Sequence, residues 1–384
     1  MRILVDRNIP YASECFSSIG TVEAYSAEDL SSADLQDAEA VVVRAVTPVN
    51  ADLLDGTAVR FVATSTSGTD HIDLDYLKAR GIGFASAAGG NANAVAEYVM
   101  AALLHLTAKH DLELVGKSIG IIGVGHIGSK VARKAEALGM RVFHNDPPLQ
   151  RETGDPRYLP LEQLFNCDFI TLHTPLTMNG IDKTYHLMDG NFLDAIRPGV
   201  FLINSARGAV ADTGSLKRSL AEGHLAGAVL DVWEEEPKID PDLMNQVDIA
   251  TPHIAGYSLE GRVSGVLIVY HALCRYFQKE ARCSADDLLP EDKNLVIEID
   301  PSTMEGQELI NRVVRRAYSI ESDDAALRKM VSLPVEERGA YFIRLRRQYR
   351  VRREFGQVEI RLQPFAPGVA DRLGRLGFRI VHDG

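Results

Sequence analysis

The sequence contains few cysteines and no long hydrophobic segment. Its 384 residues include four cysteines, none in the C-x-x-C spacing of zinc or redox sites: Cys15, Cys167, Cys274 and Cys283. Cysteines scattered in this way indicate a reducing compartment, and they argue against a disulfide framework and against a bound metal. No apolar run approaches the roughly 20 residues of a membrane span, and the N-terminal MRILVDRNIP lacks the features of a signal peptide. We therefore predict a cytoplasmic protein without a membrane partner.

An excess of basic residues is also missing. The chain holds 41 Lys and Arg against 53 Asp and Glu, and the resulting net charge of −12 argues against binding to nucleic acid. The charge is uneven, because residues 301–384 hold 16 Lys and Arg against only 11 Asp and Glu. This change of sign predicts that the last part of the chain is a separate structural unit.

Short apolar runs alternate with helix-like stretches through most of the chain. Within the first 95 residues the strand candidates are RILVD, AVVVR, RFVATST and GIGFASA. An apolar helix is expected at 93–110, and six more strand candidates follow it: SIGIIGVG, RVFHND, FITLHTP, VFLINSA, AGAVLDVW and DIATPH. Parallel strands joined by helices form doubly wound sheets, so we predict an α/β fold with two Rossmann-like domains.

The end of the chain has a different pattern. A helix-like stretch at 264–279 leads away from the second series of strands. Beyond it lie the strand candidates NLVIEID, QVEIRL and FRIVHD, with two helical segments between the first and the second. These elements predict a small C-terminal α+β domain.

A glycine-rich turn opens the second series of strands. The stretch GIIGVGHIG contains G-x-G-x-x-G at Gly123, Gly125 and Gly128, between an apolar strand and a helix. In such a turn the first glycine permits the tight bend, the second lets the backbone approach a pyrophosphate, and the third lets helix and strand pack closely. Asp146 ends the next strand, where a carboxylate accepts hydrogen bonds from the adenosine ribose and repels a 2′-phosphate. The pattern predicts NAD as the cofactor; the alternative is an ordinary glycine-rich turn of an α/β protein.

Three later strand candidates end in residues suited to acid–base chemistry. INSARGAVAD carries Arg207, DVWEEEP carries Glu236, and TPHIAGY carries His253. Each residue alone is more often structural: a turn arginine, a solvated loop glutamate or a buried histidine. Because ligands of doubly wound folds gather at the carboxyl ends of strands, the three together indicate one catalytic crevice.

The motifs GVGHIG, HTPL, INSARGAVAD, DVWEEEP and TPHIAG, in this order and spacing, resemble the D-2-hydroxyacid dehydrogenase family over about residues 40–280. The resemblance implies NAD-dependent oxidation of a small 2-hydroxy acid, with Arg207, Glu236 and His253 as the catalytic residues. It also implies a set of cofactor-binding residues: Gly123, Gly125, His126, Ile127, Gly128, Asp146, Thr174, Ala206, Asp231 and Gly256.

The chemistry explains why these residue types are needed. Oxidation removes a hydride from C2 and a proton from its hydroxyl, and we expect His253 to accept that proton as general base. Glu236 would hydrogen-bond the other ring nitrogen, fix the tautomer and favour the imidazolium. Arg207 would hold the substrate carboxylate and carbonyl so that C2 faces the nicotinamide.

Within the family, DHIDLDYL, IAGYSLEG and the C-terminal domain resemble a branch that acts on a small phosphorylated hydroxy acid and forms homodimers. This resemblance implies substrate contacts at Arg44, Ala45, Thr66 and Tyr257. Ala45 replaces a serine of that branch, so one hydroxyl contact is lost. The implied domains are 1–95 with 257–285 for the substrate, 96–256 for NAD and 286–384 for dimerisation.

Two points stay open at this stage. The arginine-rich stretch LRRQYRVRREF at 345–355 either approaches the substrate phosphate of a partner subunit or forms a solvated helix face. The function also has two alternatives, a dehydrogenase of 3-phosphoglycerate and a non-enzymatic, NAD-binding corepressor.

Overall fold

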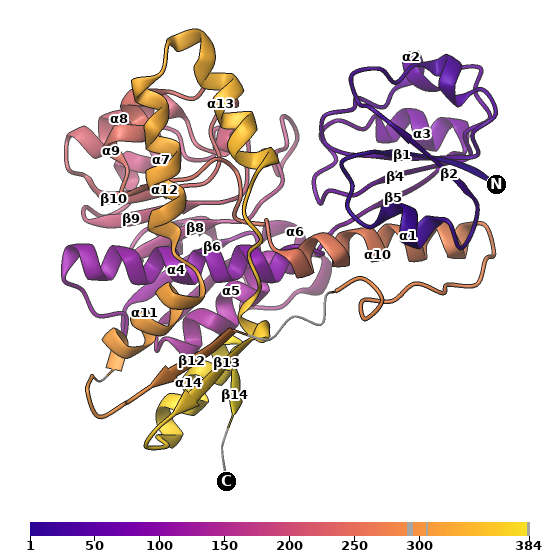
Figure 1. Ribbon diagram of the computed structural model, residues 1–384. Helices are drawn as coiled ribbons and strands as arrows, with labels where there is room; N and C mark the ends of the chain where they lie inside the picture. The colour runs from indigo at the N-terminus through magenta and orange to yellow at the C-terminus, as the bar shows by residue number, and fades with distance from the viewer. Residues whose placement is uncertain (290–294, 305, 382–384) are drawn as a thin grey trace. The chain divides into compact units, whose positions relative to one another are not determined.

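The computed structural model describes residues 1–289, 295–304 and 306–381 (Figure 1). By its internal contacts the chain divides into two units. Unit 1 comprises Met1–Asn91 and Ser258–Asp292, and unit 2 comprises Ala92–Tyr257 and Lys293–Gly384. Each unit is built on parallel sheets, as predicted for an α/β fold.

Unit 1 contains a five-stranded parallel sheet in the order β2-β1-β3-β4-β5. The strands are β1 (Arg2–Asp6), β2 (Thr21–Tyr25), β3 (Ala40–Val43), β4 (Phe61–Thr64) and β5 (Gly83–Ser86). β3 and β4 are buried along their whole length, which explains why both are uninterrupted apolar runs in the sequence. β2 was not among the predicted strands, because this edge strand is largely exposed and its sequence TVEAY lacks an apolar run.

Helices flank this sheet. They are α1 (Ala12–Phe16), α2 (Ala51–Leu54), α3 (Leu74–Arg80) and α10 (Leu259–Tyr276), with a 3-10 turn, η1, at Ser32–Leu35. The predicted helix at 264–279 is therefore correct in kind but begins five residues earlier, at Leu259. The Oγ atom of Ser258 accepts a hydrogen bond from Gly261 N at 2.9 Å, so a serine cap sets the start of the helix.

A disulfide joins Cys15 to Cys283 in unit 1, with their Cα atoms 5.3 Å apart. The expectation of four cysteines without a disulfide is wrong for this pair. The two residues are 268 positions apart in the sequence, and they meet because the segment after α10 packs against α1. Cys167 and Cys274 are buried free thiols.

Unit 2 contains a six-stranded parallel sheet in the order β11-β10-β9-β8-β6-β7. All six strands match predicted runs: β6 (Ser118–Ile122), β7 (Arg141–Asn145), β8 (Phe169–Leu172), β9 (Val200–Asn204), β10 (Leu225–Leu230) and β11 (Ile249–Ala250). The strand order reverses between β6 and β8, which is where doubly wound folds bind ligands at the carboxyl ends of their strands.

The connections of unit 2 are mainly helical. Its helices are α4 (Ala92–His110), α5 (His126–Ala137), α6 (Pro147–Thr153), α7 (Gly190–Ala195), α8 (Thr213–Ala221) and α9 (Pro241–Gln246), with 3-10 turns η2 (Leu161–Leu164) and η3 (Gly208–Val210). The helix predicted at 93–110 is confirmed as α4. α4 is buried on most sides because α5, α11 and α12 all pack against it, which accounts for its almost unbroken apolar sequence.

The C-terminal part of unit 2 has its own parallel sheet in the order β12-β13-β14. The strands are β12 (Leu295–Ile299), β13 (Val358–Leu362) and β14 (Arg379–Val381), and the helices are α11 (Gly306–Ala317), α12 (Ile320–Arg328), α13 (Val335–Arg347) and α14 (Pro367–Leu376), with 3-10 turns η4 (Lys329–Ser332) and η5 (Phe355–Gln357). Residues 294 and 382–383 of the predicted strands lie outside the described residues.

The prediction of two helical segments between β12 and β13 is wrong, since α11, α12 and α13 all lie there. Ser319 interrupts what reads as one helix, because its Oγ atom caps α12 by accepting a hydrogen bond from Ser322 N. This C-terminal module packs on α4 and α5 (Figure 1). The ammonium group of Lys134 in α5 donates to the carbonyl of Leu376 in α14.

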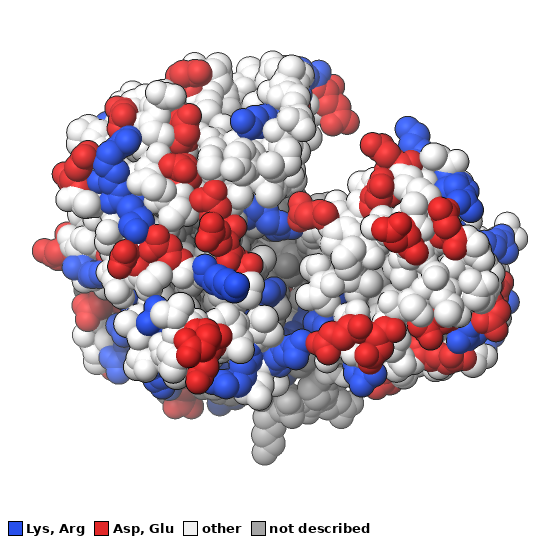
Figure 2. Space-filling view, turned by 90° about the horizontal axis from the view of Figure 1, so that it is seen from above, with Lys and Arg blue, Asp and Glu red and all other residues white. Residues whose placement is uncertain are grey.

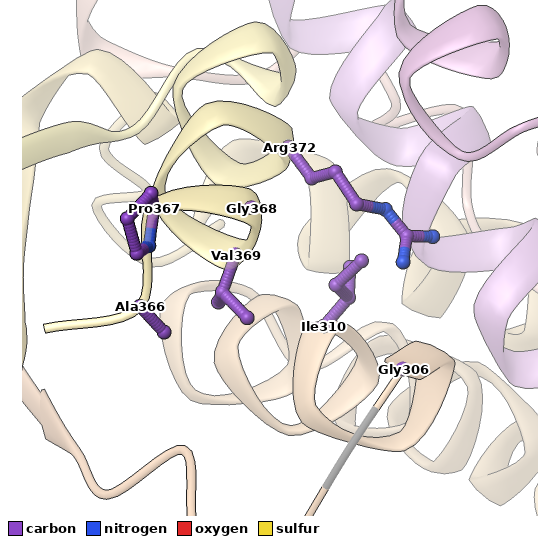
Figure 3. Close-up of a pocket in the computed structure, with 7 residues that line it drawn as sticks. All are labelled: Gly306, Ile310, Ala366, Pro367, Gly368, Val369 and Arg372. Atoms are coloured by element: carbon purple, nitrogen blue, oxygen red, sulfur yellow. The ribbon is translucent and has the colours of Figure 1, made fainter. Parts of the chain in front are cut away.

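The surface shows both signs of charge. On the face in Figure 2, Lys and Arg are interspersed with Asp and Glu rather than gathered into one basic field. A hollow of about 370 Å³ lies between α11 and α14 in the C-terminal module, where Ile310 and Val369 face each other beside Arg372 (Figure 3). None of the seven residues that line this hollow is a predicted site residue.

Candidate active site

His253 and Glu236 form a hydrogen-bonded pair in unit 2. His253 Nδ1 lies 2.8 Å from Glu236 Oε2, and the other carboxylate oxygen accepts a hydrogen bond from Trp233 N at 2.9 Å. Burial alone would raise the pKa of the Glu236 carboxyl. The His253 ring and the Trp233 N–H stabilise the carboxylate by more than burial disfavours it, so the pKa lies below its ordinary value. The imidazole is 32% exposed. Glu236 is thus an anion that orients the ring through Nδ1, and among the residues that the structure describes Nε2 has no hydrogen-bond partner.

The loop that carries His253 is bound by Asp231, the residue that directly follows β10. Both carboxylate oxygens of Asp231 accept backbone hydrogen bonds, from Ile254 N at 2.8 Å and from Ala255 N at 2.9 Å. The carbonyl of Asp231 accepts His253 N at 2.7 Å. Thr251 adds a side-chain bond to the same carboxylate. His253 itself has a φ of 57°, a left-handed conformation that is uncommon outside glycine and that these bonds stabilise.

Arg207 follows β9 and precedes the turn η3. A side chain at Gly208 would overlap the backbone of Trp233 and Glu234, so only glycine allows the Arg207 turn to lie against the loop that leads to Glu236. The structure thereby brings the turn of Arg207 next to the segment that carries the Glu236–His253 pair. Arg207 is half-buried, and its Nη1 donates to the carbonyl of Ala206 at 2.8 Å.

The predicted cofactor turn has the geometry that its glycines require. Gly123 has a φ of 88°, and a Cβ on it would press against the peptide between His173 and Thr174. A Cβ on Gly128 would overlap the carbonyl of Gly123, so the helix packs directly on the turn. Gly125 is the N-cap of α5, and among the described residues no atom lies within 4 Å of where its Cβ would be. The backbone at Gly125 is therefore open to the close approach of a ligand, at the end of a helix whose first N–H groups favour an anion.

Two further observations test whether a dinucleotide fits this edge of the sheet. Asp146 Oδ2 accepts Val124 N at 2.8 Å and its Oδ1 accepts Leu149 N at 3.1 Å, so the carboxylate is fixed at the end of β7 beside the turn. Thr174 Oγ1 is buried and has no hydrogen-bond partner among the described residues. A buried hydroxyl without a partner is costly, and a ligand in the turn would satisfy it. The residues present fit NAD.

The other predicted cofactor residues lie on the same loops. His126 and Ile127 open α5, Ala206 precedes Arg207, and Gly256 lies between the His253 loop and Tyr257. Asp231 is buried, and both of its oxygens are used by the His253 loop.

Tyr257 contacts the arginine-rich stretch of its own chain. Its ring lies 5.9 Å from the ring of Tyr349, and the guanidinium of Arg346 lies 5.9 Å from its centroid. Arg346 is also among the positive charges that lower the pKa of Glu236. The stretch at 345–355 therefore faces the candidate site within unit 2 and is not merely a solvated helix face.

The predicted substrate residues of unit 1 lie on loops after β3 and β4. Arg44 Nε donates to the buried carboxylate of Asp6 at 3.0 Å, and the next residue, Ala45, is exposed. Thr66 Oγ1 lies 2.9 Å from Thr64 Oγ1 and donates to the carbonyl of Gly68 at 3.2 Å.

Sequence reasoning missed a cluster of His186, Asp212 and Glu234. Glu234 Oε1 lies 2.5 Å from His186 Nε2, and Glu234 Oε2 accepts Thr213 N at 3.1 Å. One potential metal-binding atom from each residue, a ring nitrogen of His186 or a carboxylate oxygen of Asp212 and Glu234, lies within 4.8 Å of the other two. The cluster ties together the segments that follow β8, β9 and β10. The three residues are too far apart in the sequence for any local motif to predict that they meet. Glu234 alone could have been noticed, because it lies in the segment DVWEEEP that also carries Glu236.

Comparisons with known proteins define the class first. Residues 91–255 match the family model "D-isomer specific 2-hydroxyacid dehydrogenase, NAD binding domain", and residues 288–377 match a domain of unknown function (DUF3410). TT0316 from Thermus thermophilus is 29% identical with a TM-score of 0.62, over 73% of this chain and 98% of its own. A D-lactate dehydrogenase from Aquifex aeolicus, solved with NAD and lactic acid, is 25% identical with a TM-score of 0.60, over 72% of this chain and 96% of its own. The class is an NAD-binding 2-hydroxyacid dehydrogenase.

Curated relatives narrow this class. An erythronate-4-phosphate dehydrogenase from Salinibacter ruber is 44% identical over 93% of both chains. A protein of the same name from Escherichia fergusonii is 41% identical over 100% of this chain and 99% of its own. The chain belongs to the erythronate-4-phosphate dehydrogenase family.

No helix among the described residues is long and apolar enough to cross a membrane.

Proposed function

We propose that this protein oxidises 4-phospho-D-erythronate to 2-oxo-3-hydroxy-4-phosphobutanoate with NAD, a step in the biosynthesis of pyridoxal 5′-phosphate (vitamin B6). The observation that carries the chemistry is the contact of 2.8 Å between His253 Nδ1 and Glu236 Oε2 at the carboxyl edge of the large sheet. Similarity to erythronate-4-phosphate dehydrogenases over the full chain supports the choice of substrate.

The residues divide the reaction into binding, orientation and proton transfer. His253 Nε2 accepts the proton of the C2 hydroxyl, and in the reverse direction it returns that proton. The ionised Glu236 stabilises the resulting imidazolium through Nδ1. When bound, NAD supplies the acceptor for the hydride that leaves C2.

Arg207 is the proposed ligand for the substrate carboxylate. A guanidinium binds a carboxylate through two parallel hydrogen bonds and so fixes C2 in one orientation. Its turn is held against the Trp233–Glu234 backbone by Gly208, so the position of the arginine is set relative to the Glu236 loop. Arg44, Ala45, Thr66 and Tyr257 are the proposed contacts to the rest of the substrate, with Arg44 binding the phosphate.

The cofactor is proposed to lie over the Gly123–Gly128 turn. The N-terminus of α5 would receive the pyrophosphate, and Asp146 would bind the ribose hydroxyls. Thr174 Oγ1 would gain the hydrogen bond that it lacks among the described residues. We also retain as predictions a homodimer formed through residues 286–384, a cytoplasmic location, and a split substrate domain of residues 1–95 and 257–285.

The test is to follow NADH absorbance with the purified protein and two 2-oxo acids in parallel. We expect 2-oxo-3-hydroxy-4-phosphobutanoate to be reduced at least 10²-fold more efficiently than 3-phosphohydroxypyruvate. Preference for the three-carbon acid would contradict the proposed substrate and assign the protein to 3-phosphoglycerate oxidation. Inactivity with both acids, together with tight NADH binding, would favour a corepressor-like protein.

A further inference from the structure

A buried arginine from the C-terminal module reaches the loop of the proposed acid–base residue. Arg352 lies between α13 and η5, in the region that matches a domain of unknown function, and it is only 4% exposed. Its Nη2 donates to the carbonyl of Ala255 at 3.0 Å and to the carbonyl of Ala94 at 2.6 Å. Burying a guanidinium is costly unless its hydrogen bonds are made, so its placement against two backbone carbonyls needs an explanation.

The first carbonyl belongs to the His253 loop. Asp231 holds this loop by accepting the N–H groups of Ile254 and Ala255. Arg352 binds the same loop through the other backbone group of Ala255, by donating to its carbonyl. Ala255 is two residues from His253 and two from Tyr257. The loop is therefore clamped between a buried anion and a buried cation.

The second carbonyl belongs to the first turn of α4. The chain passes between its two units after Asn91, after Tyr257 and after Asp292. Ala94 and Ala255 lie in unit 2, each within three residues of one of the first two crossings. One guanidinium binds both carbonyls, so a residue of the C-terminal module fixes the unit 2 backbone next to these two crossings.

Neighbours of Arg352 strengthen this attachment. Asn93 donates to Glu354 Oε2 at 2.6 Å and to Glu97 Oε1 at 2.9 Å. The same oxygen of Glu97 accepts Phe355 N at 2.9 Å. The guanidinium also lies 4.3 Å from the ring centroid of Tyr318. The segment 352–355 is consequently locked onto the first turn of α4 by several independent bonds.

From this geometry we infer that Arg352 is a positioning residue for the dehydrogenase reaction, which sets the orientation of His253 through the Ala255 carbonyl. The inference rests on the proposed function. Without the guanidinium, the carbonyl of Ala255 would turn toward water and the left-handed turn at His253 would lose one of its two supports. A displacement of about 1 Å at a reacting group lowers the rate by about 10²-fold.

The experiment compares Arg352→Met and Arg352→Lys with wild type in steady-state kinetics, NADH titration and thermal unfolding. Lysine keeps the charge but presents a compact ammonium group, with three N–H donors, instead of a planar fork. We expect kcat per NADH-binding site to fall about 10²-fold in R352M and about 10-fold in R352K, with KM and the Kd of NADH changed less than 3-fold. The pH profile of kcat is expected to shift, because the environment of His253 changes.

The matched control is Arg316→Met. Arg316 also belongs to the C-terminal module and also donates to a backbone carbonyl, but that carbonyl is Glu298 in β12, which is not part of the His253 loop or of α4. We expect this control to keep kcat within about 2-fold of wild type. If R352K retains the wild-type kcat and pH profile per NADH-binding site, Arg352 only supports the fold and the inference is overturned.

Hydrogen exchange keeps the inference testable if R352M fails to fold or if the wild type proves inactive with the proposed substrate. The amides of Ile254 to Tyr257 in R352K are then compared with wild type, with bound NADH. Faster exchange confined to this loop and to the start of α4 supports the clamp. Unchanged exchange at these amides contradicts it, while absence of wild-type turnover contradicts only the proposed function.

Discussion

The proposed site residues of the two units lie on the same kind of structure but are held differently. In both units they follow the carboxyl ends of parallel strands. In unit 2, His253, Glu236 and the loop around them are bound by Asp231, Trp233 and Arg352. In unit 1, Arg44 has one ion pair with Asp6, and Ala45 beside it is exposed.

This difference separates two tasks. A proton carrier must be aimed to within a fraction of an ångström, so its loop is braced by hydrogen bonds that exist before any ligand arrives. A residue that only binds the far end of a substrate tolerates more freedom, since its contribution is the same in the ground state and the transition state. We therefore expect changes in unit 2 to lower kcat and changes in unit 1 mainly to raise KM.

The largest expected effect comes from His253→Ala. Removing the proton acceptor should lower kcat by about 10³- to 10⁴-fold, because no other group takes over general base catalysis. NADH binding should change less than about 3-fold, since the cofactor turn lies on β6 and α5. Stopped-flow turnover and NADH fluorescence titration measure the two quantities. Turnover within 10-fold of wild type would remove His253 from its proposed role.

Glu236→Gln should have the next largest effect, about 10²-fold on kcat, because the neutral amide no longer stabilises the imidazolium. The exposed neighbour Glu235 provides a control, as Glu235→Gln should leave kcat unchanged. Equal losses in both variants would show that the effect is not specific to the pair with His253.

The same variant tests a dependence of stability on pH. Folding lowers the pKa of Glu236 from its ordinary value of 4.5. Its carboxylate therefore adds stability above that value, and the contribution is lost as the pH falls through the lower pKa of the folded state. In unfolding experiments between pH 7 and about pH 3, E236Q should lose less stability than wild type, with the difference arising below the ordinary pKa of 4.5. An equal loss would mean that the carboxylate gains nothing from folding.

Arg44→Ala tests whether a proposed site residue of unit 1 affects KM rather than kcat. If Arg44 binds the substrate phosphate, KM should rise about 10-fold or more while kcat changes less than about 3-fold. Arg7→Ala is the control, since Arg7 is an exposed arginine that directly follows Asp6, the ion-pair partner of Arg44. A fall in kcat with unchanged KM would instead place Arg44 among the groups that act in the transition state.

The smallest expected effect is on the choice of cofactor. Asp146→Ser removes the charge that repels a 2′-phosphate, and it should improve kcat/KM with NADP about 10-fold relative to NAD. The ratio of the two kcat/KM values measures this directly. An unchanged ratio would show that Asp146 serves only to cap α6 and to hold Val124 N.

The candidate site was predictable to the extent that its signals are local. The glycines at 123 and 128 could be interpreted because a Cβ at either position would press against neighbouring backbone, so the spacing of the motif reports the geometry of the turn. The exposed strand β2 and the break between α11 and α12 were missed, because an edge strand needs no apolar run and a serine cap resembles a helix interior residue.

By itself the sequence determined the strands of the two large sheets except the edge strand β2, the cofactor turn and the residue types of the acid–base pair. Periodicity and glycine spacing are properties of neighbouring residues, and so they are visible without a structure. The tertiary structure alone decided that Cys15 meets Cys283, that His186 meets Glu234, and that Arg352 clamps the loop of His253. These contacts join residues 48 to 268 positions apart, and only the packing of whole elements brings such residues together.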